Sequence, residues 1–309
     1  MERLLITLIL VCTMNNITNA QNPFYGQYHT PHEAVPFDRI ETEHYEPAIL
    51  EGIKLQNAEI EAIIQNPEKA DFTNTIEAFE ESGKLLDKVV AVFGNMLSAE
   101  TNDDLQELAQ KIMPLLSEHS NNITLNEKLF ARVKEVYNQK ETLQLTQEQK
   151  QLLENAYNSF IRHGANLEGE AREEYRRLTT ELSKLTLTFS ENNLKETNAY
   201  QMLLTKKESL AGLPEIIIEA AAETAKNEEK EGWAFTLHAP SYIPFMTYSD
   251  NRDLRQKLYM AYNTKCTHDN EFNNIDIVKK IANTRMKIAQ LLGYKDYAEY
   301  TLKKRMAEN

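Results

Sequence analysis

The stretch TQEQKQLLENAYNSFIRHG, residues 146–164, contains the start, the body and the end of one amphipathic helix. Thr146 and Gln149 have the spacing of a capping box, in which each side chain bonds the other residue's backbone N–H. The apolar residues that follow recur at intervals of three and four, which places them on one face: Leu152, Leu153, Ala156, Tyr157, Phe160 and Ile161. Gly164 is well placed to end the helix. The stretch therefore predicts a capped helix with one buried face.

The same spacing recurs along most of the chain. The spacing in residues 73–97 predicts one long helix. Asn102 precedes a second predicted helix, which Pro114 should bend or break. Residues 175–189 keep a three-four alternation, as in the seam of two long antiparallel helices. Further helices are predicted over residues 252–265, 275–293 and 291–309, the last with Leu302 and Met306 on a buried stripe.

The helical spacing lapses between residues 198 and 249. Two short stretches near 198–204 and 233–238 have strand-like composition and should pair as an antiparallel ribbon. A helix that starts at Pro214 lies between them, and Pro240 and Pro244 predict a tight, irregular corner after them. Only nine Gly and nine Pro occur in 309 residues, which favours helices over many short strands. The predicted fold class is mainly α with a small β ribbon.

The first twenty residues have the parts of a secretory signal peptide: Glu2 and Arg3, the apolar run LLITLILVC, and Ala20 before the cleavage point. The run is too short to span a bilayer, so we expect removal rather than anchoring. Lipid modification of Cys12 is the competing interpretation, which Val11 disfavours because a small residue is expected there. Cleavage leaves Cys266 as the single thiol and excludes an internal disulfide. The expected location is the periplasm, without stable membrane association after cleavage.

The net charge of −13 and the sequence pI near 5.1 argue against two classes of partner. A chain this acidic repels phosphate backbones and anionic lipid surfaces. We therefore expect no nucleic-acid partner. The acidic runs at 168–174 and 228–231 are interpreted as solvated surface.

No residue pattern predicts an active site. The segment His32-Glu33-Ala34-Val35-Pro36 is close to the His-Glu-x-x-His of zinc peptidases, but Pro36 replaces the second histidine and stops the helix that this geometry needs. Cys266 and His268 are too close in sequence for the usual thiol and base, which come from distant segments. The seven histidines lack metal-ligand spacing: His29, His32, His44, His119, His163, His238 and His268. No catalytic, cofactor or metal residue is therefore predicted in this chain.

Several long motifs resemble one family of zinc metallopeptidases, which contains thimet oligopeptidase, neurolysin, oligopeptidase A and peptidyl-dipeptidase (dipeptidyl carboxypeptidase). The motifs are VPFDRIETEHYEPAILEGI, GWAFTLHAPSYIPFMTYSDNRDLRQKLYMAY and TRMKIAQLLGYKDYAEYTLKKRMA. LLENAYNSFIRHGANL and LAGLPEIIIEAAAETAK most resemble the peptidyl-dipeptidase branch. The resemblance implies a helical fold of two lobes around a channel that admits short peptides. It also implies one zinc, held by a His-Glu-x-x-His helix and a later glutamate, in a half of the family sequence that this chain does not reach.

The resemblance sets the expected organisation and function. The predicted parts are a signal peptide (1–20), an N-terminal arm (21–40), a helical lobe (41–197), and a ribbon with helices leading into a truncated catalytic lobe (198–309). The chain should supply a channel wall of an exported oligopeptidase that releases C-terminal dipeptides, with short peptides as substrates and zinc only in the full-length enzyme. The alternative is a non-catalytic, peptide-binding helical module derived from that family.

Overall fold

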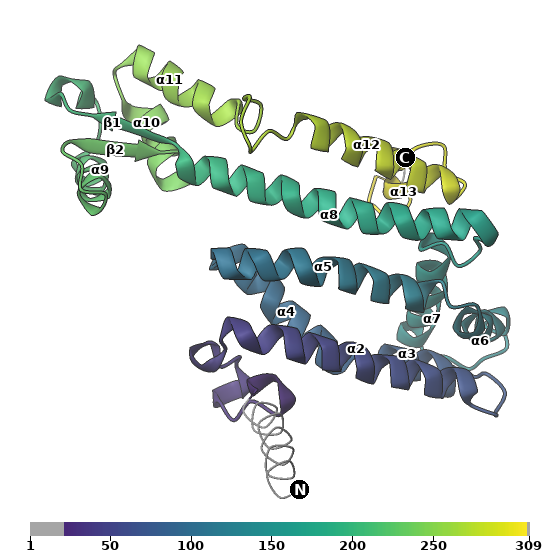
Figure 1. The fold of residues 1–309 in the computed structure, drawn as a ribbon. Helices are drawn as coiled ribbons and strands as arrows, with labels where there is room; N and C mark the ends of the chain where they lie inside the picture. The colour runs from purple at the N-terminus through teal and green to yellow at the C-terminus, as the bar shows by residue number, and fades with distance from the viewer. Residues whose placement is uncertain (1–21, 308–309) are drawn as a thin grey trace, which may run out of the picture. The chain divides into compact units, whose positions relative to one another are not determined.

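The computed structural model describes residues 22–307, which form two compact units. Unit 1 contains residues 22–183 and 286–307, and unit 2 contains residues 184–285. Helices dominate both, which confirms the mainly α fold class (Figure 1). The helix α8 (Gly169–Ala199) and the helix α12 (Ile275–Leu291) each have residues in both units.

Unit 1 is built from helices and short helical turns. Its short turns are η1 (Pro23–Tyr25), η2 (Pro31–Glu33), η3 (Phe37–Arg39) and the π-helical η4 (Phe72–Glu77). Its other elements are α2 (Thr42–Gln65), α3 (Ala78–Glu80), α4 (Lys84–Ala99), α5 (Asp103–Thr124), α6 (Glu127–Asn138), α7 (Gln147–Arg162) and α13 (Tyr297–Leu302). In Figure 1, α2, α4 and α5 pack beside one another.

The predicted capping residues begin their helices as expected. At the start of α7, Gln149 N donates to Thr146 Oγ1 at 3.2 Å, and Thr146 N donates to Gln149 Oε1 at 3.0 Å. The Asn102 side chain accepts from Leu105 N at 2.9 Å at the start of α5. Each bond satisfies a backbone N–H that has no partner inside its helix, so these helices begin at defined residues.

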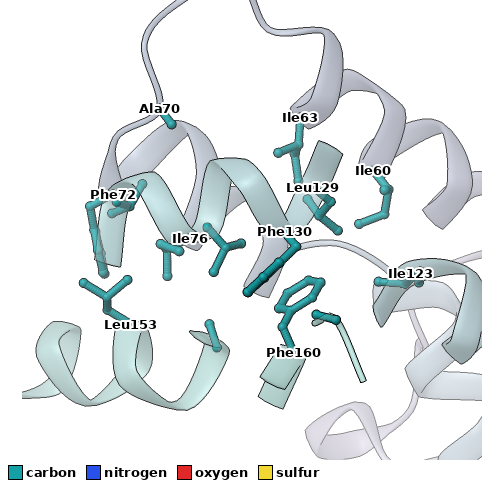
Figure 2. Packing of buried hydrophobic residues seen from close by; sticks show 14 residues of the cluster. Ile60, Ile63, Ala70, Phe72, Ile76, Ile123, Leu129, Phe130, Leu153 and Phe160 are labelled. Atoms are coloured by element: carbon teal, nitrogen blue, oxygen red, sulfur yellow. The ribbon is translucent and has the colours of Figure 1, made fainter. Parts of the chain in front are cut away.

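The main hydrophobic core of unit 1 joins α2, η4, α6 and α7 (Figure 2). Ile76, Leu129 and Leu153 are fully buried in it. Phe160 is 1% exposed, with its ring centroid 5.5 Å from that of Phe79 and 5.7 Å from that of Phe130. The apolar stripe seen in residues 146–164 therefore does face a core.

The prediction of one helix over residues 73–97 is wrong, because the chain turns at Gly83. Gly83 has φ of +79°, and its N–H donates to Glu59 Oε2 at 2.8 Å. A Cβ at this position would lie 2.3 Å from Gln56 Nε2, so both the conformation and the space favour glycine. The turn separates α3 from α4, although the apolar spacing continues across it.

At two prolines the structure differs from the sequence expectation. The helix α5 is not broken at Pro114, and buried side chains lie on both sides of it, including Ile112 and His119. The segment expected to be an irregular corner contains the helix α10 (Ala239–Tyr248). Pro240 lies in its first turn, where a backbone N–H is not needed, and Phe245 anchors it in the core of unit 2.

Unit 2 packs helices against the predicted two-stranded ribbon. The strands β1 (Gln201–Leu204) and β2 (Trp233–Thr236) pair antiparallel, with Met202 opposite Phe235, which confirms the ribbon. The turn η5 (Lys207–Leu210) and α9 (Glu215–Asn227) connect the strands, and α11 (Arg252–Asn263) follows α10. Phe235 and Phe245 are both fully buried, with ring centroids 4.6 Å apart. The ribbon is thus one wall of the unit 2 core.

The prediction for the last stretch of the chain is corrected. α12 ends at Leu291, a turn follows, and α13 covers six residues only. Met306 is fully exposed rather than part of a buried stripe. Tyr300 instead fixes this segment in unit 1, since Arg162 Nη2 donates to Tyr300 O at 2.9 Å and the Arg162 guanidinium lies 4.1 Å from the Tyr300 ring centroid.

Candidate functional site

The segment that resembles a zinc-binding motif has the wrong backbone for one. His32 and Glu33 lie in η2 with φ of 57° and 54°, and the first α-helix described begins at Thr42. Metal-binding histidines four residues apart must share one helix face. The geometry at Pro31–Glu33 therefore cannot place such ligands together.

Four histidines have local bonding partners. The Glu41 N–H donates to His44 Nδ1 at 2.9 Å at the start of α2. His119 Nε2 lies 2.7 Å from Gln56 Oε1 between α5 and α2, and burial lowers the pKa of its ring. His163 bonds Ser159 and His268 bonds Glu196, and the remaining three histidines, His29, His32 and His238, are exposed. Within residues 22–307 no three His, Cys, Asp or Glu side chains are arranged to hold a metal ion.

Cys266 and His268 do meet at one place, but Glu196 lies between them. The Glu196 side chain, which reaches from α8, accepts from the Cys266 N–H, and its Oε1 lies 2.8 Å from His268 Nδ1. Burial alone would raise the pKa of Glu196, but the bonds from His268 and Cys266 outweigh it and leave that pKa lowered. Burial and the Glu196 carboxylate raise the pKa of Cys266 to about 11.

The cluster is therefore structural rather than nucleophilic. A reactive thiol needs a lowered pKa, and the pKa of Cys266 is raised. Asn274 N also donates to Cys266 O at 2.7 Å, and Asn274 Nδ2 donates to Phe189 O at 3.0 Å. Together with Glu196 these bonds attach the loop between α11 and α12 to α8. Sequence reasoning missed Glu196, because it lies 70 residues before Cys266 and no local pattern marks it.

The helices α10 and α11 expose large apolar side chains. Their exposed fractions reach 57% at Ile243, 52% at Tyr248 and 50% at Tyr259. The Tyr242 and Tyr262 rings stack with centroids 4.1 Å apart at the same place. Several exposed apolar side chains on two neighbouring helices are consistent with a surface that contacts other polypeptide.

Two of the open grooves in the described part of unit 1 are lined by residues of its first helices. One, of about 620 Å³, runs beside η1 and is lined by Phe24, Tyr25, Leu55, Leu85 and Lys88, among others. The second, of about 920 Å³, runs between the first turns of α2 and the first turns of α5. No helix within residues 22–307 is long and apolar enough to cross a membrane.

The sequence of this chain is similar to those of known peptidases. The model of peptidase family M3 matches residues 245–309. Over 93% of its length the chain is 35% identical to dipeptidyl carboxypeptidase of Escherichia coli K12 and 30% identical to oligopeptidase A of Salmonella typhimurium LT2. It is 32% identical to oligopeptidase A of Haemophilus influenzae over 89% of its length.

These matches are to peptidase family M3 and to named peptidases. This confirms the resemblance seen in the sequence motifs. The chain spans 42% of the length of the Escherichia coli and Salmonella relatives and 41% of the Haemophilus relative.

Proposed function

We propose that this chain is the non-catalytic part of an exported zinc metallopeptidase that hydrolyses oligopeptides and releases their C-terminal dipeptides. The observation that carries the proposal is the 35% identity to a dipeptidyl carboxypeptidase over 93% of this chain, which spans 42% of that relative. In this proposal the chain supplies one wall of the channel that holds short peptides. Export is proposed from the signal-peptide pattern of residues 1–20, which lie outside the described residues.

The residues of this chain do not fit a catalytic zinc site. The sequence contains no His-Glu-x-x-His, and His32 and Glu33 lie in a turn with left-handed φ values. We therefore assign zinc to the full-length enzyme and route no catalytic step through residues of this chain. The zinc would supply Lewis-acid activation of water when bound by its own ligands.

The exposed apolar residues of α10 and α11 support a role as part of a larger enzyme. Tyr248, Tyr259 and Met260 are all about half exposed, and all three lie within the segment that the family M3 model matches. An apolar surface there is expected where further helices of the same enzyme pack.

The gene provides the sharpest test of this proposal. Sequencing past codon 309 should reveal a reading frame that continues and soon encodes His-Glu-x-x-His. A stop codon at that place would contradict the proposal and favour the alternative, a peptide-binding module without catalysis. Export is tested separately by N-terminal sequencing of periplasmic protein, which should begin at Gln21; a start at Met1 would contradict export.

A further inference from the structure

The larger of the two grooves described above lies between α2 and α5. A stripe of α2 forms one wall and a stripe of α5 forms the other, with these residues: Thr42, Glu43, Glu46, Pro47, Leu50, Asp104, Glu107, Leu108, Gln110 and Lys111. The groove measures about 920 Å³ and is open to solvent along its length. This volume is within the range of sites that hold small ligands or short peptide segments.

The floor of the groove is apolar and accessible. Leu50 is 45% exposed, although its neighbour Ile49 is fully buried against the rest of unit 1. The inward face of α2 is already occupied by Ala48, Ile49 and Gly52, so Leu50 points to a different side of the helix. Pro47 and Leu108 extend the same floor. An apolar side chain from a partner could therefore be buried here at little cost in polar desolvation.

The rim of the groove carries unpaired negative charge. Glu46 Oε1 lies 2.5 Å from Lys111 Nζ. Lys111 is the single cationic residue among those that line the groove, so the other carboxylates have no cation in the lining. Glu43, Asp104 and Glu107 line the same groove and have no ion pair among the residues described. The lining thus has three carboxylates without a counter-charge beside an apolar floor.

The first turns of both helices stabilise acidic residues through their dipoles, which accounts for part of this charge without any partner. Leu50 adds an exposed apolar side chain to the same lining.

We propose that this groove binds a short cationic peptide segment in which Lys or Arg residues flank an apolar side chain. The apolar side chain contacts Leu50 and Leu108, and the cations lie near Glu43, Asp104 and Glu107. The occupant is a free oligopeptide. The proposal goes beyond the peptidase proposal and does not depend on it, because all of the groove lies within described residues of unit 1.

Fluorescence anisotropy with labelled hexapeptides tests the proposal. The probe is a fluorescein-labelled Lys-Leu-Lys-Lys-Leu-Lys peptide, and its control carries Glu in place of each Lys. We expect the cationic peptide to bind at low salt, more weakly as salt rises, and the anionic peptide not to bind. Equal binding of the two peptides would overturn the proposal.

Paired variants separate the groove from the general acidity of the chain. The double variant Glu43→Gln with Glu107→Gln removes two groove charges and should weaken binding about tenfold. The matched control, Glu215→Gln with Glu219→Gln, removes two exposed charges from the start of α9 and should leave affinity unchanged. Equal weakening in both would mean diffuse attraction to a chain of net charge −13 and would overturn the proposal.

Two further measurements locate the site. Leu50→Ser should also weaken binding, because it removes the apolar floor but no charge; unchanged affinity would contradict that role. Hydrogen exchange with the bound cationic peptide should slow in residues 42–50 and 104–111. Slowing elsewhere, with these two segments unaffected, would refute the assignment of the groove. Circular dichroism establishes that each variant is folded.

Discussion

Gly52 permits the close approach of α2 to α4, and substitution there gives a sharp test of this packing. A Cβ on Gly52 would lie 2.9 Å from Leu86 Cα and 3.0 Å from Leu86 N, both of them backbone atoms. A side-chain tip could rotate away, but a helix backbone must move as a unit. Gly52→Ala should therefore push the two helices apart.

The expected magnitude follows from two opposing effects. Replacing a glycine inside a helix by alanine stabilises the folded protein by about 1 kcal/mol when space for the methyl group is available. Forcing extra atoms into a packed contact costs about 1–3 kcal/mol. Gly94 of α4 is the matched control, because a Cβ there meets no atom within 4 Å. We expect Gly94→Ala to stabilise unit 1 by about 1 kcal/mol, and Gly52→Ala to destabilise it by about 1 kcal/mol.

Urea unfolding provides the assay, with two probes. Far-UV circular dichroism follows the helices, and the fluorescence of Trp233, the single tryptophan, follows unit 2 alone. The helical transition should shift in opposite directions in the two variants, while the Trp233 transition stays in place. If Gly52→Ala stabilises the helices as much as Gly94→Ala does, the close contact between α2 and α4 is refuted.

Three further outcomes are expected. Phe160→Ala should cost about 3–5 kcal/mol, because it empties the centre of the unit 1 core, and a loss below about 1 kcal/mol in urea unfolding would contradict that packing. Thr146→Ala should cost about 1 kcal/mol through loss of the α7 cap, whereas Thr146→Ser should keep most of the stability; equal losses in thermal unfolding would exclude the cap. Because the folded pKa of Glu196 lies below the ordinary value of a glutamate, its carboxylate should stabilise unit 2 at pH values above that ordinary pKa, and this contribution should fade as the pH falls through the folded pKa. Acid titrations of urea unfolding, followed by Trp233 fluorescence, should show a smaller loss in Glu196→Gln; an identical loss would contradict the role of Glu196.

Much of the fold is predictable because caps and apolar spacing are local signals. The capping box at Thr146, the cap at Asn102 and the pairing of the two ribbon strands all depend on residues close in sequence or on simple strand composition. The break at Gly83 is less visible, because apolar spacing continues across it and the decisive contacts come from Gln56 and Glu59 of another helix.

The differences at the two prolines have a related cause. A proline removes one backbone donor, and sequence alone does not show whether buried neighbours offset that loss. Buried side chains of α5 lie on both sides of Pro114, and Pro240 lies in a first turn where no donor is needed. The acidic groove was not predicted either, since its two walls come from helices about sixty residues apart that only the fold brings together.

We propose that this chain is part of a zinc metallopeptidase and carries no zinc-dependent catalysis of its own. The direct measurement is zinc content per chain after incubation with zinc and removal of the excess, together with release of dipeptides from an oligopeptide. We expect zinc well below one equivalent and no release. One bound zinc per chain, with dipeptide release that a chelator abolishes, would contradict the claim.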